Sequence, residues 1–180
     1  MRIVAGERKG MRLDVPAGRG TRPTSDRLRE SLFSVLGDVS GLRVLDAFAG
    51  SGALGLEALS RGAATAEFWE TSAAALRALR ANVERLGYAD RSAVRRQDAR
   101  RRLAAAADAG ETYQLILLDP PYTMLAALQQ EFSLHLPQLL VPAGLAVIES
   151  DARAMPLALP LEMDTTRVHG AARLTVYRRV

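Results

Sequence analysis

The feature that most constrains the fold is the segment from residue 44 to residue 55, VLDAFAGSGALG. It begins as a short apolar run with a carboxylate near its end, and three glycines follow within six positions. Helix-forming residues continue from 54 to 61 and stop at Gly62. Because glycine lets the backbone turn sharply at little steric cost, this order predicts a strand, a tight turn and a helix.

The spacing of Gly50, Gly52 and Gly55 matches the turn that binds dinucleotides, in which the backbone passes close to the ligand. Glu70 lies twenty positions after Gly50, where such proteins carry an acid that binds the ribose. A glycine turn after the first strand of any α/β domain has a similar sequence. The segment therefore predicts a nucleotide-like ligand and leaves a purely structural turn open.

Strands and helices alternate along the rest of the chain. Apolar runs predict further strands at 66–69, 92–96, 115–118 and 145–148, the last after a turn at 142–144. The segments 165–168 and 173–177 predict a closing hairpin. Strand–helix alternation repeated five times predicts an α/β fold with a doubly wound, mostly parallel sheet, in which ligands bind beyond the carboxyl ends of the strands.

Ahead of this sheet, the sequence predicts a small N-terminal β-hairpin and a helix. Short apolar segments at 3–4 and 11–15 flank a turn, and residues 26–36 carry apolar side chains at helical spacing. We divide the chain into this extension, residues 1–40, and a main domain, residues 41–180, and expect the two to form one compact unit.

Four successive predicted strands are followed by an acid, namely Asp46, Glu70, Asp98 and Asp119. A single acid in this position is most simply a helix cap or a turn former. Four acids on one rim beside a glycine turn are better explained by a nucleoside ligand. In this interpretation Glu70 accepts hydrogen bonds from the ribose hydroxyls, and Asp98 faces an adenine amino group.

The segment Asp119-Pro120-Pro121-Tyr122 narrows the choice of ligand. The prolines fix φ and remove two N–H donors, so that their carbonyl groups are held as acceptors. The Asp119 carboxylate and the Pro120 carbonyl can together bind both hydrogens of an exocyclic amino group, and Tyr122 offers a flat face for a base. A strand-ending turn with a half-buried tyrosine is the structural alternative.

Charge gives a weaker indication. The formal net charge of +4 and the pI near 10.1 favour a polyanionic partner, although Lys9 is the single lysine among 24 basic residues, so genomic base composition explains the arginine excess equally well. Arg22, Arg27 and Arg29 precede or line a helix whose apolar face is committed to packing. We predict that their free guanidinium groups bind nucleic-acid phosphates.

The composition excludes several classes of protein. A hydrophobic fraction of 48% and a charged fraction of 24% are those of a folded soluble domain. No apolar stretch approaches the ~20 residues that span a bilayer, and the first residues lack the apolar region of a signal peptide. Without cysteine there is no disulfide and no thiolate metal site. We therefore expect a cytoplasmic protein without a metal.

Two blocks of sequence carry a family resemblance. DAFAGSGALGLEALSRGA at 46–63, together with Asp119-Pro120-Pro121-Tyr122, resembles the class I S-adenosylmethionine-dependent methyltransferases. RPTSDRLRESLF at 22–33 and the opening MRIVAG narrow the resemblance to the bacterial 16S ribosomal RNA (guanine-N2) methyltransferases, the RsmD family. The resemblance covers nearly the whole chain, and its N-terminal block is the part specific to this family.

The resemblance implies a Rossmann-like sheet of seven strands in the order 3-2-1-4-5-7-6, with the last strand antiparallel. It also implies methyl transfer to N2 of a guanine, position 966 of 16S rRNA, by a monomer acting on a part-assembled or assembled small subunit. The implied S-adenosylmethionine-binding residues are Asp46, Phe48, Gly50, Gly52, Glu70, Thr71, Asp98 and Ala99. The implied catalytic residues are Asp119, Pro120 and Tyr122.

Other functions remain open from the sequence. The same Asp-Pro-Pro-Tyr clamp serves amino methyltransferases that act on DNA adenine-N6 or on protein glutamine. A nicotinamide-dependent dehydrogenase has no use for such a clamp, and the chain lacks a second nucleotide-binding half. A noncatalytic rRNA-binding module needs no glycine turn and clamp together. The Arg100-Arg101-Arg102 run is interpreted as a solvated helix face, with RNA contact as the alternative.

Overall fold

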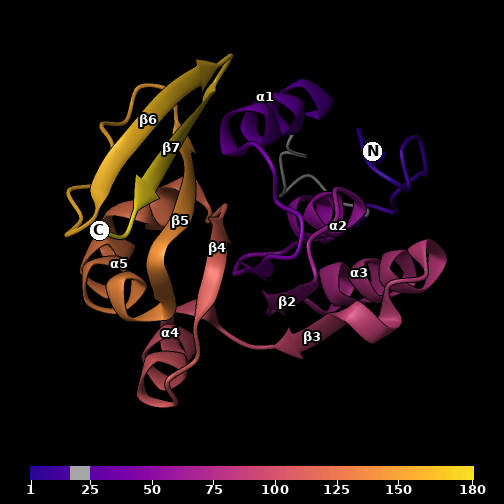
Figure 1. The fold of residues 1–180 in the computed structure, drawn as a ribbon, viewed down its shortest axis with the longest axis horizontal. Helices are drawn as coiled ribbons and strands as arrows, with labels where there is room; N and C mark the ends of the chain where they lie inside the picture. The colour runs from indigo at the N-terminus through magenta and orange to yellow at the C-terminus, as the bar shows by residue number, and fades with distance from the viewer. Residues whose placement is uncertain (17–24) are drawn as a thin grey trace. The chain divides into compact units, whose positions relative to one another are not determined.

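The computed structural model describes residues 1–16 and 25–180, which form two compact units, residues 1–97 and 98–180 (Figure 1). Each unit is described by itself. The first unit contains α1 (Asp26–Leu36), β1 (Arg43–Asp46), α2 (Ala53–Ser60), β2 (Thr65–Glu70), α3 (Ala73–Leu86), the 3₁₀ helix η1 (Ala89–Arg91) and β3 (Ser92–Arg96). The second contains α4 (Ala99–Asp108), β4 (Tyr113–Leu118), the 3₁₀ helix η2 (Tyr122–Met124), α5 (Leu125–Leu139), β5 (Leu140–Asp151), β6 (Glu162–His169) and β7 (Ala172–Arg178).

The strands form a seven-stranded sheet in the order β3-β2-β1-β4-β5-β7-β6. Within the first unit, β2 pairs in parallel with both β1 and β3. Within the second, β4 and β5 are parallel, whereas β7 is antiparallel to both β5 and β6. The predicted fold class, the strand order and the closing hairpin are all confirmed.

The core of the first unit lies around α2, the helix that follows the glycine turn. All eight residues of α2 are buried, and β1 and β2 bury every position except their ends. The helix packs on both of these strands. Because α2 is covered on all sides, the position of the glycine turn that precedes it is fixed by the packing of the unit.

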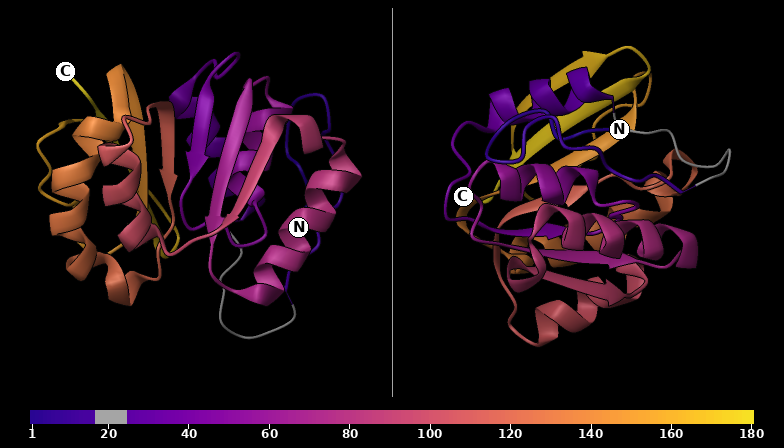
Figure 2. Two further views of the ribbon diagram at one scale, coloured as in Figure 1. Left: turned by 90° about the horizontal axis from the view of Figure 1, so that it is seen from below. Right: turned by 90° about the vertical axis from the view of Figure 1, so that its right-hand side faces the viewer.

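In the second unit, α4 and α5 lie side by side, and α5 packs on β5 (Figure 2). The buried stripe of α5 consists of Leu125, Leu128, Phe132, Leu136 and Leu139, at helical spacing. The predicted turn at residues 142–144 is instead part of β5, which runs from residue 140 to residue 151. Ala143 has a φ of 62°, and the β4–β5 register shifts between Tyr113 and Leu115, so the turn residues form an irregularity within the strand.

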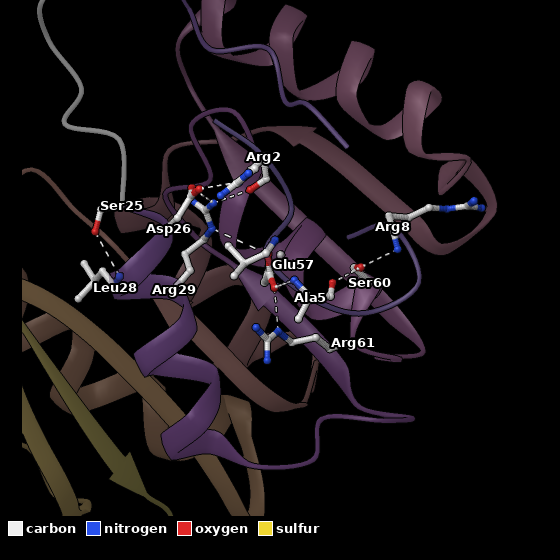
Figure 3. Close-up of polar contacts among 12 residues, drawn as sticks. Arg2, Ala5, Arg8, Ser25, Asp26, Leu28, Arg29, Glu57, Ser60 and Arg61 are labelled. Atoms are coloured by element: carbon white, nitrogen blue, oxygen red, sulfur yellow. Dashed lines mark hydrogen bonds and ion pairs between the residues drawn. The ribbon is translucent and has the colours of Figure 1, made fainter. Parts of the chain in front are cut away.

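In the N-terminal segment, Arg2 and Arg12 form one antiparallel bridge, and the N–H groups of Ile3 and Leu13 donate to the carbonyls of Met11 and Met1 at 2.9 and 3.0 Å. Two other backbone N–H groups of this segment bind α2, because Val4 and Ala5 donate to the carboxylate of Glu57 at 2.8 and 2.9 Å. A Cβ added to Gly6 would lie 1.8 Å from the Ser60 carbonyl oxygen, so only glycine fits against α2 there. The segment is thus docked on α2 rather than folded as a free-standing ribbon (Figure 3).

Candidate functional site

The glycine turn between β1 and α2 is closely packed behind its backbone. Gly52 is the N-cap of α2 with a φ of 84°, and a Cβ added there would lie 2.3 Å from the Leu79 side chain of α3. At Gly55 an added Cβ would lie 2.4 Å from the ring of Phe68 on β2. Gly50 differs, because an added Cβ would meet nothing within 4 Å. The turn is therefore tightly packed at Gly52 and Gly55 and has open space at Gly50.

Glu70, at the end of β2, holds this turn directly. Its Oε2 accepts a hydrogen bond from the N–H of Gly50 at 2.8 Å, and its Oε1 accepts from the N–H groups of Thr71 and Ser72, both at 2.7 Å. The predicted residues Gly50, Glu70 and Thr71 are therefore brought together at one end of β2. The Glu70 carboxylate thus connects the glycine turn to the start of α3 and holds the two segments together.

Asp46, the acid that ends β1, supports the helix from inside. It is 1% exposed, and its Oδ2 accepts a hydrogen bond from the N–H of Gly55 in the first turn of α2 at 2.9 Å. The N-cap residue Gly52 has no side chain to cap the helix, so Asp46 supplies a cap from the preceding strand. Phe48, which lies between Asp46 and Gly52 in the sequence, is half-buried.

Asn82 is a buried residue of α3 that the sequence patterns do not single out. Its side-chain amide donates to the carbonyl of Ser51 in the glycine turn at 3.0 Å. It also donates to the carbonyl of Asp14 at 2.9 Å and accepts from the Asp14 N–H at 2.7 Å. Asn82 thus ties the glycine turn to the N-terminal segment, which runs beside α3 (Figure 2). A polar residue within an apolar helical stripe was the available signal.

Asp98 caps a helix, as the structural interpretation of a strand-ending acid allows. Its side chain accepts a hydrogen bond from the N–H of Arg100 at 3.0 Å, which makes it the N-cap of α4, and it forms an ion pair with the Arg100 guanidinium at 2.9 Å. Hydrogen bonding to Arg100 lowers the pKa of Asp98 from its ordinary value of 3.8. The Arg100 guanidinium is therefore engaged in an ion pair with Asp98. The neighbouring residue Ala99 is buried.

The cap and the predicted ligand contact of Asp98 can be separated by two substitutions. We expect Asp98→Ala to lower the free energy of unfolding by about 1 kcal/mol, because a helix cap is lost. Asp98→Ser keeps a capping oxygen but is too short to reach a ligand, so it should unfold like the parent protein. If Asp98 also binds an adenine amino group, both variants will bind S-adenosylhomocysteine roughly tenfold more weakly by calorimetry. Equal affinity for S-adenosylhomocysteine in all three proteins would show that Asp98 caps the helix and does not bind the ligand.

The same carboxylate contributes a pH dependence of defined sign. Because the pKa of Asp98 is lowered in the folded protein, its stabilising contribution is present above the ordinary value of 3.8. That contribution is lost as the pH falls through the lower folded-state pKa. The unfolding free energies of the parent and of Asp98→Ala, measured in urea, should therefore converge in the acid range.

The Asp119-Pro120-Pro121-Tyr122 loop begins where β4 ends. Asp119 and Tyr122 are half-buried, Pro120 is buried, and the Met124 N–H closes the following turn on the Pro121 carbonyl at 2.8 Å. The Tyr122 hydroxyl donates to Oε1 of Glu149 at 3.1 Å. The loop therefore folds back over β5, and its tyrosine is anchored at the hydroxyl end.

Glu149 is a second residue that the analysis of the sequence missed. It is 7% exposed and follows directly on Ile148, the partner of Leu118 in the parallel register of β5 and β4. Asp119 follows directly on Leu118 at the end of β4, so it and Glu149, which lies within β5, are at the same level of neighbouring strands. The rule that found the four other acids applies here too, because Glu149 immediately follows the predicted strand at 145–148.

The predicted RNA-binding arginines have three different outcomes. Arg22 lies outside the described residues, and Arg27 is exposed on α1. Arg29 is fully buried, so the prediction that its guanidinium group is free on the polar side of the helix is wrong. It donates to Oδ1 of Asp26 at 2.8 Å and to the carbonyl of Arg2 (Figure 3).

The burial of Arg29 has a physical cause in α2. Glu57 is also fully buried and lies 3.9 Å from the Arg29 guanidinium, and it forms an ion pair with Arg61 at 2.8 Å. Burial lowers the pKa of Arg29, while the charges of Glu57 and Asp26 oppose that effect. Arg29 thus neutralises a carboxylate that holds the N-terminal segment, and the amphipathic pattern of α1 could not show this partner.

The described residues contain neither a candidate metal site nor a helix that could span a membrane. No cluster of three or more histidine, aspartate or glutamate side chains in residues 1–16 and 25–180 could hold a metal ion. Across the same residues, no helix has both the length and the apolar character needed to cross a membrane.

Comparison with known proteins places the chain. Residues 1–178 match the family described as "Conserved hypothetical protein 95". The chain belongs to this family. It is 36% identical to the "Putative rRNA methyltransferase YlbH" of Bacillus subtilis over 99% of both chains. It is 40% identical to the "Ribosomal RNA small subunit methyltransferase D" of Escherichia coli over 68% of this chain and 60% of that one.

A solved structure of the same kind confirms the fold of the family. The chain superimposes on the "Putative methyltransferase yhhF" of Escherichia coli with a TM-score of 0.86 and 34% sequence identity, over 99% of this chain and 97% of that one. The family assignment and the methyltransferase-like sheet therefore agree over almost the whole length.

Proposed function

We propose that this protein transfers a methyl group from S-adenosylmethionine to the exocyclic N2 of a guanine in small-subunit ribosomal RNA. The observation that carries the proposal is the anchored Asp119–Tyr122 loop at the end of β4, in a chain whose full-length relative is named an rRNA methyltransferase. Such a loop has acceptors for an amino group and a ring for a base.

The glycine turn fits the adenosyl cofactor. Open space at Gly50, next to a carboxylate at the end of β2, is what a ribose and its attached chain require. We propose that Gly50, Gly52 and Glu70 are the main cofactor-binding residues of the first unit. We also propose cofactor contacts for Asp46, Phe48, Thr71, Asp98 and Ala99, of which Asp46 and Asp98 in addition cap helices.

The chemistry asked of the protein is modest. Bound S-adenosylmethionine supplies a methyl group on a sulfonium, which is already an activated leaving group. Guanine N2 is a poor nucleophile because its lone pair is delocalised into the ring. Asp119 and the Pro120 carbonyl accept its two hydrogens, favour a pyramidal nitrogen and stabilise the positive charge that develops there. Tyr122 stacks on the base after it has left its helix.

We also propose that Arg22 and Arg27 bind phosphates of the RNA. These contacts position the substrate and do not read its sequence. We further propose that the protein acts in the cytoplasm as a monomer on 16S rRNA, within a part-assembled or assembled small subunit. Its target is the guanine that the family resemblance implies.

The function is tested by incubating the protein with labelled S-adenosylmethionine and undermethylated small-subunit rRNA or subunits, and then mapping the label. We expect one guanine to carry the label at N2. In a parallel melting experiment, S-adenosylhomocysteine at 100 times its Kd should stabilise the protein by about 2.7 kcal/mol, and NAD should have no effect. Label on adenine, or stabilisation by NAD alone, would contradict the proposal.

A further inference from the structure

The carboxylate of Glu149 has no role in the function proposed above, yet it touches the residues that perform it. Its Oε1 accepts the hydroxyl hydrogen of Tyr122 at 3.1 Å. It lies within β5 at the level where β4 ends and Asp119 begins, because Leu118 and Ile148 are register partners. A buried carboxylate therefore lies beside the proposed base clamp, on the neighbouring strand.

The hydrogen-bonding edge of guanine suggests what this carboxylate does. Guanine presents three hydrogens in a row, two on N2 and one on N1. Adenine and cytosine present an amino group next to a ring nitrogen that is an acceptor. An ionised carboxylate can only accept. Beside an amino group already held by Asp119, it attracts the N1–H of guanine and repels the lone pair of the other two bases.

We infer that Glu149 selects guanine by accepting the hydrogen bond of N1–H, while Asp119 and Pro120 hold the amino group. This inference rests on the proposed function and assigns it a specificity-determining residue. The Tyr122 hydroxyl orients the carboxylate, and the Tyr122 ring stacks on the same base. A site built to bind a particular hydrogen strongly rejects an analogue that lacks it, because its own polar group is then left without a partner.

The test uses two analogues at the mapped target position of the RNA. 2-Aminopurine keeps the N2 amino group but has a lone pair on N1, whereas inosine keeps N1–H and lacks the amino group. With the wild-type protein we expect 2-aminopurine RNA to be methylated on the order of 10²-fold more slowly than guanine RNA. Binding measured by fluorescence anisotropy in the presence of S-adenosylhomocysteine should be weaker for both analogues than for guanine, because each analogue leaves an acceptor of the site without its hydrogen.

Glu149→Gln should remove most of this preference. The amide oxygen can keep the hydrogen bond from Tyr122, and the amide NH₂ group can then donate to N1 of 2-aminopurine. We expect methylation of guanine RNA to fall by about 10- to 100-fold and the ratio of guanine to 2-aminopurine methylation to drop by at least that factor. S-Adenosylhomocysteine binding and the melting temperature report whether the variant is folded.

Two controls separate selection from positioning. Tyr122→Phe removes only the hydroxyl, so the guanine preference should persist at a lower rate. Glu131→Gln removes a charge from α5, where Glu131 pairs with His135, and should behave as wild type. If Glu149→Gln slows guanine and 2-aminopurine equally, as Tyr122→Phe does, the inference fails while the proposed function stands. If the wild-type protein methylates no guanine RNA, both fail.

Discussion

Replacing Asp119 with alanine is expected to lower the rate of methyl transfer by on the order of 10²–10³, the usual loss when one preorganised polar partner of a reacting group is removed. The carboxylate follows the fully buried end of β4 and is half-exposed, so its truncation leaves no large cavity. S-Adenosylhomocysteine binding should change little, because Gly50 and Glu70 are unaltered. Single-turnover methylation and calorimetric binding on the same preparations give the two numbers.

A graded series sharpens the result. Asp119→Asn keeps one acceptor oxygen without the charge, so its rate should fall between those of the parent and the alanine variant. Tyr122→Ala should act mainly on capture of the base, with a loss of roughly 1–3 kcal/mol of stacking. An Asp119→Ala protein that binds the cofactor and methylates at close to the parent rate would show that Asp119 only terminates a strand.

The second large effect is on stability. Glu57→Ala is expected to lower the free energy of unfolding by about 3–5 kcal/mol, because the buried Arg29 keeps only the partly exposed Asp26 as a counter-charge. Glu57 also binds the backbone of Val4 and Ala5 and the side chain of Arg61. Urea unfolding measures the loss. A change below about 1 kcal/mol would mean that water replaces these contacts and that the cluster is more open than its burial indicates.

Arg29→Met and Arg27→Ala form a matched pair on the same helix. Arg29 is fully buried whereas Arg27 is exposed, so only the first variant should unfold more easily. If Arg27 binds an RNA phosphate, Arg27→Ala should reduce the slope of RNA affinity against salt by about 1. An unchanged slope would identify Arg27 as part of a solvated face. Arg29→Met cannot be used to test RNA contact, because its main effect is on folding.

Much of the fold could be predicted from local patterns. Three glycines after an apolar run specify a turn wherever they occur, and alternating apolar segments of two lengths specify strands and helices. The order of these elements restricts a parallel sheet to a few topologies, so the ends of β1, β2 and β4 were correctly placed as the positions of Asp46, Glu70 and Asp119.

Tertiary structure determined what those residues bind. Asp46 accepts from Gly55 and Asp98 from Arg100, so two of the four acids are helix caps as well as candidate ligands. A capping acid and a ligand-binding acid have the same sequence signature, because both follow a strand and precede a helix. Only the positions of the backbone N–H groups distinguish the two.

The largest departures involve partners far apart in the chain. Arg29 looked solvent-facing because α1 shows only its own apolar stripe, and its partner Glu57 lies on α2. The N-terminal hairpin was expected from its apolar pairs, but its hydrogen bonds to Glu57 on α2 and to Asn82 on α3 were not. Residue order alone determined the strands, the turn and the acids that follow them. The pairing of buried charges, and the side chains that bind the N-terminal segment, depended on contacts that form only when the helices pack.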